Sequence, residues 1–218
     1  MLGHLYIQKD DIVEANLAAR RAYEADAFLA TAQDILWRLW STSYDLENRR
    51  QSRQWCEEGL ARFADNPRFY RCQIWNMTSG ATDPDAQAAW ALLEDVLSRT
   101  PERDRQSARL EMQILIAGVL ARSAQEGGST AASAGEFTDS ARAVLGRSRG
   151  DTEVDPNREL LTTQAFVRTL LGDDQEAVDL LQEYLTFNPE RRVGFAEHGH
   201  WWWRELRSHP AFQRMIGG

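Results

Sequence analysis

Apolar residues recur at spacings of three and four along most of the chain, and this pattern limits the fold more than any other feature. Two clear examples lie within residues 35–40 and 90–97. Such spacing is typical of amphipathic helices, because residues three and four apart share one face of a helix. Runs that alternate every second residue, as strands require, are nearly absent. The sequence therefore predicts an all-α fold.

Helix boundaries divide the chain into pairs of helices. An acidic residue before proline, at 83–84 and at 155–156, predicts two helix starts. A further start is expected at Thr138, after a Gly/Ser-rich connection over 125–137. Each pair alone would leave an apolar face exposed, and stacking of successive pairs would bury it. The sequence predicts about five antiparallel hairpins, at 1–27, 29–65, 68–100, 105–148 and 156–188.

Two segments share a repeated pattern. In 2–28, a Leu-Gly pair and a tyrosine precede small residues on one face of the next helix, and in 170–190 a glycine, an alanine and a proline mark a turn, a close contact and an end. This pattern resembles the tetratricopeptide repeat, a helix–turn–helix unit of about 34 residues. The positions that match are Leu2, Gly3, Tyr6, Ala15, Ala22, Gly172, Ala177 and Pro189.

The resemblance implies a right-handed superhelical array over 1–190, with a concave groove lined mostly by the first helix of each unit. It also implies a non-catalytic scaffold, without cofactor, that holds a peptide or protein partner in or beside the groove. Because Trp and Arg commonly anchor partners, the candidate binding residues are Trp37, Trp75, Arg38, Arg68 and Arg71. The alternative is that the tryptophans form the core between repeats and the arginines pair with neighbouring acids.

Two other functions stay open. The chain could be a structural subunit, or the tail of a longer signalling protein, that associates through the face near Leu2 and Tyr6. It could also be a metal-binding enzyme that uses His198, His200 and His209, although the spacing does not predict a metal site. The letters Gly-x-Ser-x-Gly at 146–150 lack the preceding strand that a nucleophile elbow needs. We therefore expect no catalytic residues.

Composition restricts location and partners. A net charge of −8 and the lack of any long apolar run argue against nucleic acid and against insertion into a membrane. Of the 25 lysines and arginines only Lys9 is a lysine, which we attribute first to coding bias. Cys56 and Cys72 form no metal-binding or redox motif, so buried, reduced thiols are expected. These features predict a cytoplasmic protein.

The C-terminal segment, 191–218, contains three adjacent tryptophans. Repeat arrays need a cap over the last stacking face, and this segment resembles tails that close tetratricopeptide regions in some bacterial regulators. We expect one or two of the tryptophans to be buried against the last hairpin. Since three consecutive helical residues span about 200°, another should be exposed. The expected cap residues are Trp201, Trp202, Trp203, Leu206, Pro210 and Phe212.

Overall fold

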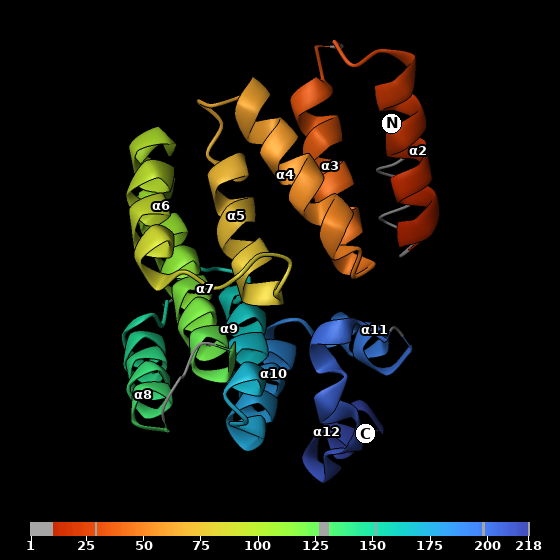
Figure 1. Cartoon of the computed structure of the whole chain (residues 1–218). Helices are drawn as coiled ribbons and strands as arrows, with labels where there is room; N and C mark the ends of the chain where they lie inside the picture. The colour runs from red at the N-terminus through yellow and green to blue at the C-terminus, as the bar shows by residue number, and fades with distance from the viewer. Residues whose placement is uncertain (1–10, 29, 127–130, 151, 198, 218) are drawn as a thin grey trace.

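The computed structural model describes residues 11–28, 30–126, 131–150, 152–197 and 199–217. These residues form helices and no strand, which confirms the all-α prediction. Consecutive helices pack against each other in pairs, and the pairs follow one another as an array (Figure 1). Among the described helices, none is both long enough and apolar enough to cross a membrane.

Both helices of four predicted hairpins are described. The fifth, at the N-terminus, is represented by its second helix, α2 (Ile12–Ala25). The four pairs are α3 (Ala32–Asp45) with α4 (Arg49–Arg62), α5 (Arg68–Ser79) with α6 (Ala86–Arg99), α7 (Arg105–Glu126) with α8 (Ala131–Arg147), and α9 (Leu160–Leu170) with α10 (Asp174–Phe187).

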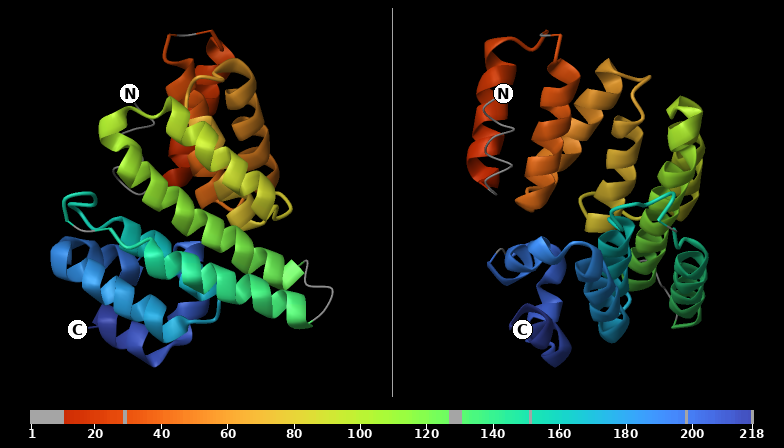
Figure 2. Two further views of the ribbon diagram at one scale, coloured as in Figure 1. Left: turned by 90° about the vertical axis from the view of Figure 1, so that its left-hand side faces the viewer. Right: turned by 180° about the vertical axis from the view of Figure 1, so that it is seen from behind.

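After α10 the chain turns back beside the last hairpin. Figures 1 and 2 show this C-terminal segment lying next to α10 and beneath the ends of α3 and α4. It consists of short helices joined by tight turns. These are η2 (Pro189–Arg191), α11 (Arg192–Glu197), η3 (Trp201–Trp203), η4 (Glu205–Ser208) and α12 (Pro210–Gly217). Another short helix, η1 (Glu102–Asp104), precedes α7.

The repeat positions lie where helices meet or end. Ala15 and Ala177 are fully buried, whereas Ala22 is half-buried. Gly172 has a φ of 71°, in the left-handed region that glycine adopts without strain, and it lies in the turn between α9 and α10. Pro189 follows the end of α10. Leu2, Gly3 and Tyr6 lie outside the described residues.

The expected connection over 125–137 is wrong. Helix α7 continues to Glu126 and α8 begins at Ala131, so only 127–130 separate them. Thr138 is inside α8, where its hydroxyl donates to the carbonyl of Ala134 at 2.9 Å. The alanines of this segment favour helix strongly, and this preference outweighs the cost of about 1 kcal/mol for the glycine at 135.

The expectation of reduced thiols is also wrong. Cys56 and Cys72 are fully buried, as predicted, but they form a disulfide between α4 and α5. The two residues are 16 apart in sequence, and the antiparallel packing of the two helices brings them together. The cysteines therefore no longer indicate a reducing compartment.

A neutral hydrogen-bond network joins the second hairpin to the third. The side-chain oxygen of Asn76 on α5 accepts from Trp40 Nε1 on α3 at 3.1 Å and from Ser52 Oγ on α4 at 2.5 Å. All three side chains are buried. One amide thus links three helices, next to the disulfide.

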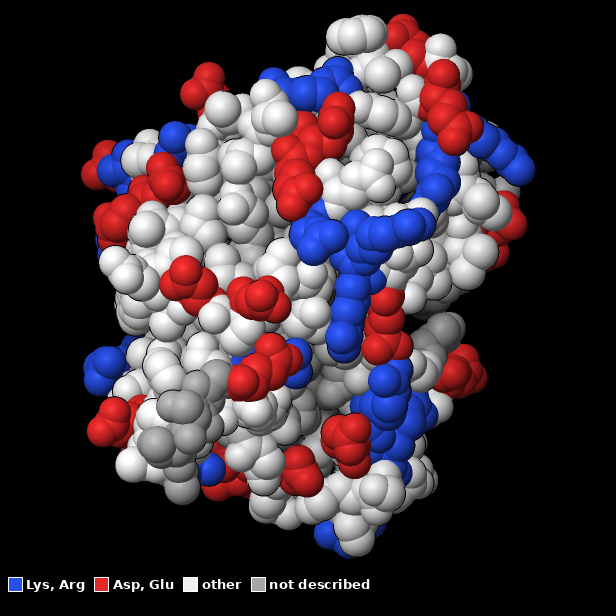
Figure 3. Space-filling model, viewed as in Figure 1, with Lys and Arg blue, Asp and Glu red and all other residues white. Residues whose placement is uncertain are grey.

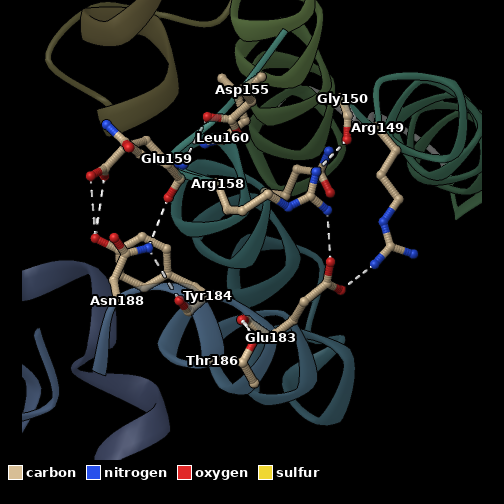
Figure 4. Close-up of polar contacts among 12 residues, drawn as sticks. Arg149, Gly150, Asp155, Arg158, Glu159, Leu160, Glu183, Tyr184, Thr186 and Asn188 are labelled. Atoms are coloured by element: carbon tan, nitrogen blue, oxygen red, sulfur yellow. Dashed lines mark hydrogen bonds and ion pairs between the residues drawn. The ribbon is translucent and has the colours of Figure 1, made fainter. Parts of the chain in front are cut away.

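Charged groups join the loop before α9 to the last helix of the array (Figure 4). Asp155 accepts from the backbone N–H groups of Glu159 and Leu160, both at 2.9 Å, and so satisfies the start of α9. Arg158 donates to Glu183 on α10 at 2.7 Å, and Arg149 also pairs with this carboxylate. One glutamate of α10 thus binds two arginines, and the side chain of Asn188 at the end of α10 also donates to the carbonyl of Asn157 in the loop at 2.8 Å.

Candidate functional site

The C-terminal segment packs against α3, α5 and α9. The indole of Trp202 lies between the ring of Trp75 on α5, with centroids 5.4 Å apart and planes at 9°, and the ring of Phe166 on α9, at 4.6 Å and 12°. Its Nε1 donates to the hydroxyl of Tyr44 on α3 at 3.0 Å. Burial raises the pKa of this tyrosine well above its ordinary value. Trp202 thus joins α3, α5 and α9, and Trp75 is covered by the protein's own tail.

The prediction that one of the three tryptophans is exposed is wrong. Trp203 is buried and contacts Phe195, while Trp201 and Trp202 are half-buried. Trp201 packs against Tyr44 at 5.4 Å and Phe166 at 5.2 Å. The argument from one helical face fails because the segment lies between two surfaces, the last hairpin and the ends of α3 and α5.

The other cap residues divide between the interior and the surface. Leu206 and Phe212 are fully buried. Pro210 is the first residue of α12 and is itself exposed. Helix α12 contacts α10, so the cap packs against the last hairpin as well as against α3 and α5.

The remaining candidate binding residues do not form one free groove. Arg68 pairs with Asp34 at 2.9 Å and lies over the ring of Trp37, 5.8 Å from its centroid. Arg38 is half-buried and makes no ion pair within the described part of the chain.

Arg71 instead joins two helices of the array. It pairs at 3.2 Å with Glu111 on α7, and about a quarter of each side chain is exposed. Burial raises the pKa of Glu111, although Arg71 and Trp75 act in the opposite direction. Arg71 and Trp75 therefore have structural contacts, and neither is available to a partner in this conformation.

A cleft of about 340 Å³ opens where the start of α4, the ends of α5, α7 and α9, and the C-terminal segment meet. We call it the central cleft. A smaller pocket shares four of its residues and extends it toward Tyr44 and Ser52. The cleft is lined by Glu47, Arg49, Thr78, Ser79, Arg122, Gln125, Phe166, Thr169, Leu170, Trp201, Trp202, Arg204 and Glu205.

Backbone geometry positions two charged groups of the central cleft. Gly80 ends α5 with a φ of 73°, and a Cβ at this position would come within 2.3 Å of the Arg122 guanidinium. Glu47 has a φ of 53°, which is uncommon for a residue other than glycine. It lies between α3 and α4 and pairs with Arg204 across the cleft. The positive φ angles of Gly80 and Glu47 thus belong to turns at the ends of helices.

Charged and aromatic side chains line the central cleft together. Arg122 pairs with Glu126, and Arg204 pairs with Glu47. Arg49 is exposed and makes no ion pair with any described residue. The cleft therefore presents one unpaired guanidinium beside the rings of the C-terminal segment.

Basic side chains gather around the central cleft. Figure 3 shows them over the lower part of α4 and, below it, over the segment between α11 and α12. Arg49, Arg50 and Arg53 are the exposed arginines in the first half of α4, which has no acidic residue in its first turn. Positive charge at a helix N-terminus opposes the helix dipole. Helix stability therefore does not explain these arginines.

The described histidines make local contacts. His200 accepts from the backbone N–H of Trp202 at 3.3 Å through Nδ1, and its Nε2 lies 3.4 Å from Asp45. His198 lies outside the described residues, and the described residues contain no group of three side chains able to bind a metal. Ser148 is buried at the end of α8, and its hydroxyl donates to Val144. Ser148 therefore marks the end of a helix, as the sequence predicts.

Comparison of the chain with family models, with curated proteins and with solved structures found no match. The candidate site therefore depends on its geometry. Sequence reasoning missed Arg122 and Phe166. Neither carries a local signal, because each becomes part of the site only when the array brings α7 and α9 to the C-terminal segment.

Proposed function

We propose that this chain is a non-catalytic interaction module that holds a segment of a protein partner in the central cleft. The observation that carries the proposal is the central cleft, in which the exposed, unpaired Arg49 lies beside the aromatic side chains of Phe166, Trp201 and Trp202. Aromatic faces and arginines are the groups that most often anchor protein partners. The resemblance to tetratricopeptide repeats supports the proposal, and membership of that family stays a prediction, as does a cytoplasmic location.

The test compares capture of partners by the full chain and by two charge-reversal variants. Arg49→Glu changes the lining of the central cleft, whereas Arg53→Glu changes an exposed arginine on the same helix that pairs with Glu57 at 3.9 Å. We expect a partner from the source cells to be retained by the wild type and by Arg53→Glu and to be lost by Arg49→Glu. Equal capture by all three would show that binding, if any, occurs elsewhere.

A second function, as a permanent subunit of an assembly, is favoured by α2. Val13 and Leu17 lie one helical turn apart on this helix, with 53% and 39% of their surface exposed. An exposed apolar pair at the first described helix of an array is a surface on which a neighbour could stack. Sedimentation of the purified chain tests this alternative. It predicts an oligomer that Leu17→Glu dissociates, and a monomer would contradict it.

A further inference from the structure

A second pocket, of about 290 Å³, lies between the start of α9, the end of α10, α11 and η3. We call it the aromatic pocket, because five of its eight described lining residues carry a ring: Tyr184, Phe195, His200, Trp202 and Trp203. It adjoins the central cleft, with which it shares Trp202. Pockets for small molecules are lined mostly by such apolar rings and measure about 300–1,000 Å³. The aromatic pocket therefore suits a ligand at the small end of this range.

The rings of the aromatic pocket hold one another in place. Phe195 is edge-on to Tyr184, with centroids 6.3 Å apart and planes at 75°, and it contacts Trp203 at 5.7 Å. Trp203 and Trp202 are also 5.7 Å apart, with planes at 86°. The hydroxyl of Tyr184 donates to the carboxylate of Glu159 at 3.3 Å (Figure 4). A wall that is already ordered loses little entropy on binding, and a further flat ring would extend its edge-to-face contacts.

The charges around the aromatic pocket favour a neutral ligand. Arg191 is the charged residue of the described lining, and its side chain is 63% exposed and lies 3.9 Å from Glu190. Glu159, on the hydroxyl of Tyr184, adds a second negative charge nearby. His200 accepts from a backbone N–H through Nδ1, as a neutral ring does. An ammonium group would be repelled by the arginine and a carboxylate by the two glutamates.

Two hydroxyls of the aromatic pocket are hydrogen-bond acceptors for a ligand. The Thr162 hydroxyl donates to the carbonyl of Glu159 at 2.7 Å, and the Tyr184 hydroxyl donates to the carboxylate of the same residue. Both hydrogens are thus used within the protein, while each oxygen can still accept a hydrogen bond. A ligand with an N–H or O–H group complements these oxygens, and a ligand without a donor does not.

We propose that the aromatic pocket binds a neutral, flat molecule of one or two fused rings that carries an N–H or O–H donor. Indole and phenol are the simplest members of this class. The ring of the ligand packs against Phe195 and Trp203, and its donor faces the hydroxyls of Thr162 and Tyr184. The proposal is separate from the proposed function, since it makes no use of the charges of the central cleft.

The test is titration of the full-length chain with indole, followed by calorimetry. We expect a Kd on the order of 0.1–1 mM, as suits a ligand of so few atoms. Benzofuran has the same shape without the donor, and it should bind about threefold to tenfold more weakly. Benzoate and phenyltrimethylammonium, which carry one charge each, should bind more weakly than indole. Tighter binding of either ion would overturn the neutral class.

Variants then show whether indole occupies the aromatic pocket. A Cβ at Gly194 would meet no atom within 4 Å, so Gly194→Leu adds a side chain to the wall without a clash, and it should weaken binding by about tenfold or more. Gly135→Leu is the matched control, because its Cβ is equally free but lies on α8. Phe195→Ala removes a ring of the wall and should also weaken binding. Thr162→Val keeps the shape and should narrow the difference between indole and benzofuran.

Each variant is first checked for an unchanged helical circular dichroism spectrum and melting temperature. If Phe195→Ala alters the fold, Gly194→Leu still decides the question, because its site is open. Arg49→Glu should bind indole as the wild type does, which separates this test from that of the central cleft. Indole binding that neither Gly194→Leu nor Phe195→Ala weakens would overturn the inference. So would the absence of saturable binding at millimolar indole.

Discussion

Two regions of the array hold neighbouring helices together by different chemistry. One is the junction between the second and third hairpins, and the other is formed by the junctions of the last hairpin. Around α3–α5, the links are a buried disulfide and the neutral network of Asn76. Around α8–α10, the links are carboxylates shared between arginines. Asp173 accepts from Arg142 at 2.6 Å and from Arg168 at 2.7 Å, and Glu183 accepts from Arg149 and Arg158.

The difference lies in how each junction responds to solution conditions. Buried neutral groups do not titrate, and salt screens them little. Leaving one of them without a partner costs about 1–3 kcal/mol. Exposed ion pairs contribute about 0–1 kcal/mol and weaken with salt. The junction around Asn76 should therefore be insensitive to pH and salt, and the junction around Asp173 and Glu183 should respond to both. The central cleft lies between the two.

The largest effect is expected from Trp202→Ala, which separates the two halves. The side chain stacks on Trp75 and Phe166, so its loss should lower the free energy of unfolding by about 3–5 kcal/mol. Denaturation by urea, followed by circular dichroism, should then show two transitions. Trp90→Ala is the control, because 39% of Trp90 is exposed. An equal loss in both variants would contradict a specific role for Trp202.

Removal of the disulfide should destabilise the N-terminal half. The bond closes a short loop between α4 and α5, so the double replacement Cys56→Ala and Cys72→Ala is expected to cost about 3 kcal/mol. Mass spectrometry after alkylation without reductant should find no free thiol in the wild type. Two alkylated cysteines in the folded, non-reduced protein would show that the bond is absent.

Asn76→Ala tests the neutral network. The replacement leaves Trp40 Nε1 and Ser52 Oγ buried without their acceptor, and we expect a loss of about 2 kcal/mol. The loss should be the same at low and high salt. Gln54→Ala, on the exposed side of α4, should change stability by less than about 0.5 kcal/mol. A loss that shrinks with added salt would argue against the neutral character of this junction.

Asp173→Asn tests the charged junction. Burial alone would raise the pKa of Asp173, but hydrogen bonds and charge from Arg142 and Arg168 outweigh burial and lower it. The carboxylate therefore stabilises the fold above its unfolded pKa of about 4, and this contribution is lost as pH falls below that value. We expect Asp173→Asn to cost about 1 kcal/mol at neutral pH and to make stability less dependent on acid. High salt should reduce the difference between wild type and variant.

The smallest effect is expected from Tyr184→Phe, which should change stability only in alkaline solution. Burial, with help from the nearby carboxylate of Glu159, raises the pKa of Tyr184 to about 12. Because the unfolded pKa is about 10, the tyrosine favours the folded state fully below pH 10. That contribution is lost as pH rises from 10 through the folded value. Tyr184→Phe should remove this alkaline decline in part, as thermal melts between these pH values would show. An unchanged decline would assign it to other groups.

Local features were predictable and distant contacts were not. The hairpins follow from apolar spacing that spans a few residues, and the burial of Trp203 and Phe212 agrees with the expected cap. The disulfide and the contact of Trp202 with Tyr44 could not be predicted, because each depends on how helices pack. Tyr44 and Trp202 are 158 residues apart in sequence. The spacing of apolar residues does not encode where the tail meets the array.

The position of Trp202 between Trp75 and Phe166 has a consequence for the part of the array that lies between these two residues. In an open array a hairpin can be duplicated or deleted, because each unit touches only its neighbours. Here the hairpins from α5 to α9 are enclosed between two rings that touch the same indole. One extra hairpin would carry the tail away from Trp75, and one fewer would leave it misplaced. The tail therefore sets the number of hairpins that can lie between α5 and α9.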